Sequence, residues 1–471
     1  MDVHIDLTGT RGHRDAIYRQ LRAAILDGRI RPGEALPPTR ELAQRLAVSR
    51  TTVSAAYDRL TAEGFLAGRV GAGTFVTASA LTRRPAPSAV SGVRPLPEWD
   101  ALPSPPAPFA PAPEFDFRPG VPDLTRFPFD TWRRLVTQRL RAGQADLMTY
   151  GDPQGLASLR AEIARHIGVS RDVRASADQV VVTAGAQQTT DLVGRVLLRA
   201  GDIAAVEDPG YPPPRLVLAA RGVRVAPVPV DASGIVVSAI PPGTRLVYVT
   251  PSHQYPLGLS MSLERRLELL DWAERTDAVV VEDDYDTEFR YTGRPLEPLH
   301  SLDSRGRVVY VGSFSKVLSP ALRLGFLIAP PSLVPALVKA RYLTDWHAPN
   351  VEQAALAAFM AEGGFARHVR RMRKVYRARH ELLSGLLAAS FADFLTPLPS
   401  SAGLHLSATS SSDLSSLVRR ARQDGVRLYS LGDFAVGERR HGLVFGYGAV
   451  AAERIGPGLA RLRALADEGA A

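Results

Sequence analysis

Six short apolar runs recur between residues 179 and 328, and each is continuous rather than alternating. The runs are Gln179-Val180-Val181-Val182-Thr183, Ile203-Ala204-Ala205-Val206, Arg245-Leu246-Val247-Tyr248-Val249, Ala278-Val279-Val280-Val281, Val308-Val309-Tyr310-Val311 and Gly325-Phe326-Leu327-Ile328. Segments of helical periodicity separate them. A strand that is apolar on both faces must be covered on both, which is typical of a helix-covered sheet. The sequence therefore predicts an α/β fold from residue 114 onward, with a smaller C-terminal subdomain after about residue 365.

Polar residues follow five of these runs directly. Because ligands of such sheets bind at the carboxyl ends of the strands, we expect these residues to share one edge. They are Gly185-Ala186-Gln187, Asp208-Pro209-Gly210-Tyr211, Ser252-His253-Gln254-Tyr255, Asp283, and the segment from Ser313 to Lys316.

Lysine is rare in this chain. Of 57 basic side chains, only those at positions 316, 339 and 374 are lysines. Lys316 ends the small-residue segment Gly312-Ser313-Phe314-Ser315-Lys316. A lysine kept where arginine is otherwise used indicates a need for a primary amine, which can form an imine with an aldehyde.

An amine, a carboxylate, a phenol and a glycine-opened helix are the groups that pyridoxal 5′-phosphate requires. Lys316 would form the imine, and Asp283 would pair with the protonated ring nitrogen. The helix that Gly185-Ala186-Gln187 opens offers free N–H groups to the phosphate, and we expect Ser313, Ser315 and Arg323 to complete that cup. Taken singly, these residues also fit a surface lysine, a turn cap, packing tyrosines and an ion-pair arginine. Their order at successive strand ends favours the cofactor site.

The first 77 residues carry a different pattern. Helical spacing over 14–28 is followed by two short helical segments that Thr39 and Ser49 are placed to cap, the second ending near Gly64. Two short helices joined by so tight a turn form a helix-turn-helix. The segments 65–67 and 74–77 then read as strands flanking the glycine tip Gly71-Ala72-Gly73.

Residues 14–77 resemble the GntR-type winged helix-turn-helix. The resemblance is carried by Leu36-Pro37-Pro38-Thr39-Arg40-Glu41-Leu42-Ala43, Val48-Ser49-Arg50-Thr51-Thr52-Val53, Tyr57, Leu60, Glu63-Gly64 and Gly71-Ala72-Gly73-Thr74-Phe75-Val76. In this arrangement the exposed first turn of the recognition helix reads base edges in the major groove, and it consists of Ser49, Arg50, Thr51 and Thr52. Arg40 would contact a guanine or a phosphate, and the glycine tip that includes Gly73 lets the wing approach the minor groove or the sugar-phosphate chain. A solvated charge is the alternative for both arginines.

Composition sets wider limits. The net charge of +9 permits binding to a polyanion but does not locate it. The densest basic run, Arg367 to Lys374, has the spacing of a helix with one solvated face, and a second nucleic-acid contact is the alternative. The absence of cysteine excludes disulfide scaffolds and thiolate zinc sites, and we predict no metal ligand. With no secretory segment and no bilayer-spanning run, we expect a cytoplasmic protein without membrane contact.

From about residue 114 to 465 the chain resembles the fold type I aminotransferases. By that resemblance Lys316 is the Schiff-base lysine, Asp283 the partner of the ring nitrogen and Tyr285 a donor to the phenolic oxygen of the ring. The resemblance further implies that Tyr211 stacks on the ring, that Arg323 binds the phosphate and that Tyr150 reaches the phosphate of a partner subunit. His253 joins the cofactor-binding set through its place at the third strand end.

A GntR-type head, a body of this kind and a proline-rich connection resemble the MocR/GabR group of regulators, including the PdxR kind. Ten prolines lie between Pro85 and Pro113. We therefore expect a winged helix-turn-helix over 10–78, a linker over 79–113 and an aminotransferase-like, cofactor-binding and dimerisation domain over 114–471. The resemblance implies a head-to-tail, domain-swapped homodimer that binds operator DNA and a small-molecule effector.

Two departures bear on activity. Aminotransferases carry asparagine before the proline of a turn that here reads Tyr255-Pro256-Leu257-Gly258, and they grip the substrate carboxylate with an arginine where this chain has Val444. Without that charge-assisted pair, the binding of an amino-acid carboxylate is weaker by roughly 1.5–3 kcal/mol. We therefore assign no catalytic residue. Pyridoxal phosphate itself, controlling vitamin B6 supply, and an amine or amino acid forming an external aldimine are the two candidate effectors. A working aminotransferase is the alternative function, against which the intact DNA motif argues.

Overall fold

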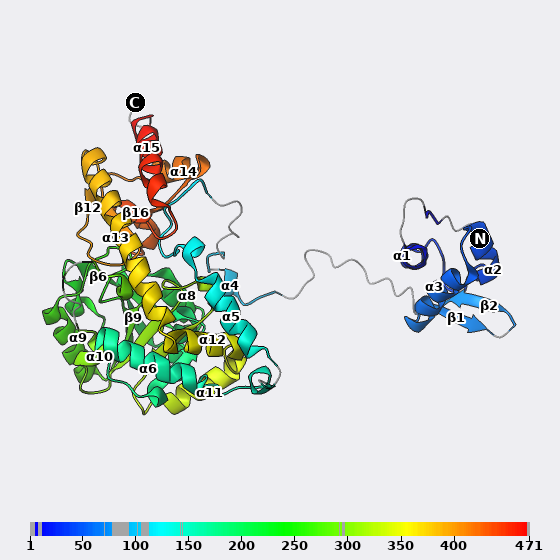
Figure 1. Cartoon of the computed structure of the whole chain (residues 1–471), viewed down its shortest axis with the longest axis horizontal. Coiled ribbons are helices and arrows are strands. Elements are labelled where there is room, and N and C mark those ends of the chain that lie inside the picture. The colour runs from blue at the N-terminus through cyan, green and yellow to red at the C-terminus, as the bar shows by residue number, and fades with distance from the viewer. Residues whose placement is uncertain are drawn as a thin grey trace. The chain divides into compact units, whose positions relative to one another are not determined.

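The computed structural model describes residues 5–7, 12–69, 71–77, 94–100, 102–104, 113–141, 143, 145–291, 293 and 297–468. The chain divides into two compact units, Met1–Leu96 and Pro97–Ala471, which are described separately (Figure 1). Most of the expected linker, 79–113, lies outside the described residues. Its described part includes the four-residue helix α4 (Pro97–Asp100), where the proline-rich pattern predicted no helix.

The first unit is a three-helix domain with a β-hairpin. Its elements are α1 (His13–Leu26), α2 (Thr39–Arg45), α3 (Arg50–Ala62), β1 (Leu66–Arg69) and β2 (Gly73–Val76). The apolar positions predicted from helical spacing form its buried core, in which Ile17, Leu21, Val53 and Leu60 are fully inaccessible to solvent. The winged helix-turn-helix predicted from the sequence is confirmed.

The two predicted helix caps in this unit have different outcomes. Ser49 precedes α3, and its Oγ accepts the backbone N–H of Thr52 at 3.1 Å, as expected. The prediction that Thr39 caps α2 is wrong. Thr39 is the first helical residue, Pro38 occupies the cap position, and no side chain caps this helix.

An eight-stranded sheet organises the second unit. Its strands are β4 (Val180–Thr183), β5 (Ile203–Asp208), β6 (Arg224–Asp231), β7 (Gly234–Ile235), β8 (Thr244–Val249), β9 (Val279–Asp284), β10 (Val308–Ser313) and β11 (Gly325–Ile328). Their spatial order is β4-β11-β10-β9-β8-β5-β6-β7. The central strands from β10 to β6 run parallel, β11 is antiparallel to both neighbours, and β7 is antiparallel to β6. All six predicted strands are present.

Helices cover both faces of this sheet. Because successive side chains of a strand point to opposite faces, Val181, Val281 and Val309 pack with α7, α8 and α11, whereas Val280 and Val308 pack with α9 on the other face. The helices of this unit that precede the C-terminal subdomain are α5 (Phe129–Arg139), α6 (Ala157–Arg171), α7 (Ala186–Leu197), α8 (Pro212–Ala219), α9 (Leu263–Thr276), α10 (Leu299–Leu302), α11 (Val334–Asp345) and α12 (Asn350–Ala361). The covering explains why the strands are apolar throughout.

The predicted C-terminal subdomain contains a small antiparallel sheet of order β12-β13-β16-β15. Its elements are α13 (Gly364–Ser390), β12 (Thr396–Pro397), β13 (His405–Thr409), α14 (Ser415–Gln423), β14 (Val426–Arg427), β15 (Tyr429–Ser430), β16 (Gly442–Gly446) and α15 (Ala452–Glu468), and β14 pairs with β3 (Phe115–Asp116). Helix α13 extends between this subdomain and the main sheet region (Figure 1). The basic run 367–374 lies on α13 with its arginines and lysine exposed, as its spacing predicted.

None of the helices within the described parts of the chain combines the length and the apolar character that crossing a membrane requires.

Candidate functional site

A cavity of about 280 Å³ opens at the carboxyl ends of the central strands. Its size is close to the lower end of ordinary ligand pockets, about 300–1,000 Å³. The lining brings together these residues of the predicted cofactor set: Gly185, Ala186, Gln187, Tyr211, Asp283, Tyr285, Ser313, Ser315, Lys316 and Arg323. The edge of the sheet at which the sequence placed them therefore contains a pocket.

Lys316 presents a buried primary amine to this cavity. Burial lowers its pKa, and the nearby charge of Asp283 opposes that shift. The backbone of Gly120 runs beside the amine, since a Cβ at this positive-φ position would lie 3.0 Å from Nζ. A depressed pKa raises the share of the neutral, nucleophilic amine near neutral pH.

Asp283 is the penultimate residue of strand β9 and is almost fully buried. Burial raises its pKa to about 7, and the hydroxyl of Tyr248, which donates to Oδ2, opposes the rise. Among the described residues Oδ1 has no hydrogen-bond partner. Since buried carboxylate oxygens are nearly always paired, this free acceptor fits a ligand that brings its own N–H group.

The other end of the cavity suits a phosphate. Gly185, with φ of 113°, precedes the first turn of α7, and Gly185, Ala186 and Gln187 line the cavity, so the N–H groups of that turn are available to a ligand. Ser313, Ser315 and Arg323 lie in the same lining, and Ser313 Oγ accepts the N–H of Ser315 at 3.1 Å. Helix N–H groups, a hydroxyl and a guanidinium are the donors that bind a phosphate dianion.

Three tyrosines form the aromatic wall. The ring of Tyr255 lies 5.4 Å from that of Tyr211 and 6.1 Å from that of Tyr285. Burial raises the pKa of Tyr211 to about 12 and those of Tyr255 and Tyr285 well above their ordinary value, so all three stay protonated and able to donate. Tyr255, which the sequence placed at this edge without assigning it to the cofactor set, is thus a lining residue.

Other parts of the site were missed by the sequence analysis. Pro119, Gly120 and Thr250 line the cavity. The hydroxyl of Tyr248 donates a hydrogen bond to the carboxylate of Asp283. Thr250 also donates its N–H and its hydroxyl, at 3.2 and 2.6 Å, to the buried carboxylate of Glu207. Tyr248 and Thr250 flank the end of the third apolar run, which is the signal that would have identified them.

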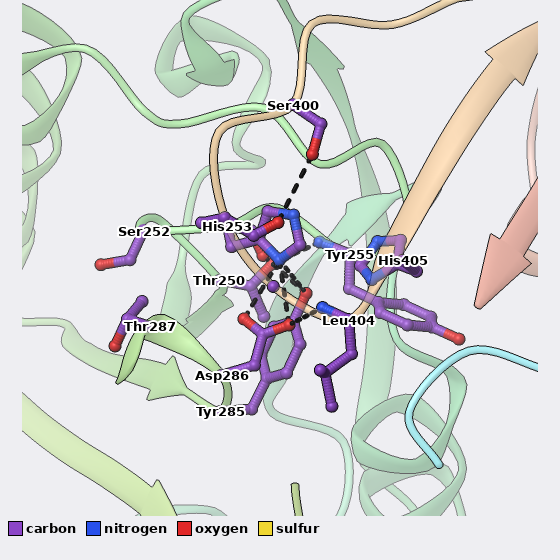
Figure 2. A network of polar contacts seen from close by, with 12 residues as sticks. Thr250, Ser252, His253, Tyr255, Tyr285, Asp286, Thr287, Ser400, Leu404 and His405 are labelled. Atoms are coloured by element: carbon purple, nitrogen blue, oxygen red, sulfur yellow. Dashed lines mark hydrogen bonds and ion pairs between the residues drawn. The ribbon is translucent and has the colours of Figure 1, made fainter. Parts of the chain in front are cut away.

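Two predicted cofactor residues lie outside this lining. Tyr150 is exposed and stacks on Trp346 with ring centroids 4.3 Å apart, so its expected reach into a partner subunit stays a prediction. His253 is buried behind Tyr285, whose hydroxyl lies 3.1 Å from Nδ1 (Figure 2). His253 thus contacts a wall of the cavity rather than the cavity itself.

The place of the expected carboxylate-binding arginine is apolar. Val444 is fully buried in β16 among Leu257, Leu431 and Phe434. Arg439 and Arg440 are close to Val444 in sequence, but both are exposed and neither lines the cavity. Lys316 and Arg323 are the basic residues in the described lining.

In the first unit, the residues predicted to contact DNA lie at the start of α3 and around it. Ser49, Arg50 and Thr51 are exposed and Thr52 is partly exposed. Arg40 is exposed on α2, and Gly73 begins β2 with a positive φ of 109°. This arrangement leaves the first turn of the recognition helix free to meet a DNA groove.

Comparisons with known proteins assign both units. Residues 13–76 match the family described as "Bacterial regulatory proteins, gntR family", and residues 121–436 match "Aminotransferase class I and II". The chain is 38% identical over 467 residues to the probable rhizopine catabolism regulatory protein MocR of Rhizobium meliloti, covering 96% of this chain and 93% of MocR. The chain belongs to the MocR-type GntR regulators.

Further similarities fit this family. The pyridoxine biosynthesis transcriptional regulator PdxR of Corynebacterium glutamicum is 34% identical, over 92% of this chain and 91% of PdxR. Kynurenine aminotransferase from Pyrococcus horikoshii aligns with a TM-score of 0.70 and 26% identity, over 75% of this chain and 90% of the enzyme. A MocR-type regulator thus joins a DNA-binding head to a body with the aminotransferase fold.

Proposed function

We propose that this MocR-type regulator binds pyridoxal 5′-phosphate in the cavity and operator DNA through α3, and that the cofactor is itself the effector. The genes under control would then be those of vitamin B6 supply, and the protein would act in the cytoplasm. When bound, pyridoxal phosphate supplies an electrophilic carbonyl carbon that a primary amine can attack.

The residues present fit the cofactor at each of its functional groups. The neutral amine of Lys316 can attack the carbonyl, and the free Oδ1 of Asp283 can accept the ring N–H. Tyr285 can donate to the phenolic oxygen, Tyr211 can cover the ring, and the α7 N-terminus with Arg323 can bind the phosphate. The unpaired Oδ1 of Asp283 is the observation that carries this proposal, because only a ligand with a donor relieves it.

The lack of a second cation favours the cofactor over an amino acid as effector. With the phosphate on Arg323 and the imine on Lys316, the described lining has no cation left for a carboxylate, and Val444 is sealed in an apolar cluster. We therefore do not propose turnover of amino acids. An amine without a carboxylate needs no second cation in the lining, which makes such an amine the second candidate effector.

We also propose a homodimer of the head-to-tail, domain-swapped kind. The exposed pair Tyr150 and Trp346 supports it, since two stacked aromatic rings at a surface are typical of an interface. In such a dimer Tyr150 would contribute to the partner's phosphate site.

Lys316→Ala tests the cofactor assignment. The purified protein should be yellow with pyridoxal phosphate, and borohydride reduction should fix the label on the peptide that contains Lys316. The alanine variant should lose both the visible band and the label, because no other primary amine lines the described cavity. Lys339→Ala, at a lysine on α11 outside the lining, is the matched control and should keep them. A covalent chromophore that persists in Lys316→Ala would refute the assignment.

A further inference from the structure

A buried hydrogen-bonded chain leads away from the cavity behind Tyr285 (Figure 2). The Tyr285 hydroxyl donates to the backbone oxygen of His253 at 2.9 Å and lies 3.1 Å from its Nδ1. The same Nδ1 lies 3.1 Å from both carboxylate oxygens of Asp286. Asp286 then accepts the N–H of Leu404 at 3.2 Å, in the loop that leads to β13. Side chains of His253 and Asp286 are each 1% exposed.

The surroundings allow His253 only one arrangement. Its Nε2 has no hydrogen-bond partner among the described residues and faces Gly258, where a Cβ would lie 3.3 Å away. A proton on Nε2 would therefore be unsatisfied, whereas a proton on Nδ1 is donated to Asp286. Asp286 thus selects the Nδ1–H tautomer of His253.

Packing prevents the imidazole from turning. A Cβ at Gly403 would lie 2.1 Å from Cε1 of His253 and 2.5 Å from Oδ2 of Asp286, so the backbone closes over both groups. The His405 ring lies 4.6 Å from that of His253, and its Nε2 is held by the backbone oxygen of Pro256 at 3.0 Å. His253, Asp286 and His405 are close enough to suggest a metal site. With His405 Nε2 engaged and Gly403 filling the space, the arrangement is better explained as a hydrogen-bond network.

We propose that Asp286 is a positioning residue for Tyr285. Its carboxylate fixes the tautomer and orientation of His253, and His253 in turn holds the Tyr285 hydroxyl at the wall of the cavity. This inference rests on the proposed function, in which the Tyr285 hydroxyl turns its one proton from the backbone oxygen of His253 to the phenolic oxygen of pyridoxal phosphate. It also links the cavity to the C-terminal subdomain, because Asp286 is bonded to the backbone of Leu404.

The pH at which the Lys316-bound chromophore titrates reports the Tyr285 hydrogen bond. A donor to the phenolic oxygen stabilises its deprotonated form, so losing the donor raises the titration midpoint. A bond to a charged group is worth about 1.5–3 kcal/mol, or about 1–2 pH units. Tyr285→Phe should raise the midpoint by that amount. Asp286→Asn should raise it by a smaller step, about 0.5 unit or more, because the hydroxyl is present but no longer held.

A double-mutant cycle separates positioning from a general structural effect. In the Tyr285→Phe background Asp286→Asn should not raise the midpoint, since the group it positions is gone and the lost carboxylate charge, which raises the pKa of Lys316, can only lower it. The matched control is Asp284→Asn, at a neighbouring buried carboxylate that accepts from Tyr310 and Arg171 rather than from His253. This control should leave the midpoint where the parent has it. If Asp286→Asn does not fold, as judged by its thermal transition, His253→Gln replaces it in the same cycle with the same expectation.

The possible results are distinguishable. An unshifted midpoint in Asp286→Asn, or an upward shift that persists in the Tyr285→Phe background, would overturn the positioning role alone. A parent protein that shows no visible band with pyridoxal phosphate would overturn the proposed function, and this inference with it.

Discussion

At the scale of single residues, burial disfavours the charged form of three carboxyl groups in and around the site. Burial raises the pKa of Asp283, and also those of Glu207 and Glu282, to about 7. Arg266 opposes the shift at Glu282, and donors from Thr250 oppose it at Glu207. Asp283 has one donor, from Tyr248, and one oxygen without a partner. The cofactor-free protein should therefore be strained most at this residue.

Asp283→Asn should stabilise the cofactor-free protein at alkaline pH. The folded-state pKa of Asp283, about 7, lies above its ordinary value of 3.8. Between about pH 4 and 7 the folded protein therefore keeps a proton on Asp283 that the unfolded chain has released. The free energy of unfolding consequently falls as pH rises through that window. Asparagine removes this loss, and we expect a gain of roughly 1–3 kcal/mol at pH 8 that shrinks as pH falls and disappears by about pH 4. Urea unfolding at both pH values measures it.

The same variant should bind pyridoxal phosphate more weakly, because a neutral amide cannot pair with the protonated ring nitrogen. Glu282→Gln, at a buried carboxylate outside the cavity, is the control and should leave cofactor binding unchanged. Equal stability of Asp283→Asn and the parent at pH 8 would contradict the view that this carboxylate is poised for a ligand.

Sequence reasoning found Lys316 through its rarity and Asp283 through its place after an apolar run. It did not assign Gly120 or Tyr255 to the cavity. Gly120 comes from a segment far from the strand ends in sequence, and only the folded chain brings it beside Lys316. Tyr255 stands where aminotransferases carry an asparagine. The sequence therefore indicated the loss of that asparagine, and not that the tyrosine ring would line the cavity.

At the scale of elements, continuous apolar runs predicted the six strands that helices cover on both faces. Strand β6 was missed because it is partly exposed along its length and contains Pro227 and Pro229, which interrupt the apolar pattern. The two-residue β7 is too short to show any period. The β6–β7 end of the sheet is thus less visible in the sequence than the fully buried strands, including the edge strand β4, since partial burial leaves a weaker pattern.

The recognition helix α3 yields a prediction at the same scale. Arg50→Ala and Arg40→Ala should each weaken operator binding by about 1–3 kcal/mol if they contact bases, while leaving the visible cofactor band unchanged. Arg29→Ala is the matched control in the same unit, because Arg29 is paired with Asp27 at 2.8 Å, away from α3. Operator titration at fixed salt measures the difference. Both variants retarding operator DNA as well as the parent would show that α3 is not the reading element.

At the scale of the whole molecule, the chain joins a cavity in one compact unit to a DNA-reading helix in another. A ligand can shift the balance between two arrangements of the protein only through a difference in its affinity for them. The proposed cofactor would find a partner for each of its functional groups in the cavity, whereas an amino acid would lack a cation for its carboxylate. The difference in affinity that operates the regulator should therefore come from pyridoxal phosphate itself.

Operator affinity should accordingly differ between cofactor-free and cofactor-bound protein with no amino acid present. A coupling of about 1–3 kcal/mol corresponds to a change of roughly 5–150-fold. The measurement is an operator titration with cofactor-free protein, with added pyridoxal phosphate, and with a panel of amines and amino acids, at one salt concentration because phosphate contacts make the affinity salt-dependent. Lys316→Ala, which cannot hold the cofactor covalently, should respond far less than the parent. The titration curves without and with pyridoxal phosphate could instead be identical, with a clear response to one amine or amino acid. That result would identify that compound as the effector, because its added charge or bulk would then supply the difference in affinity.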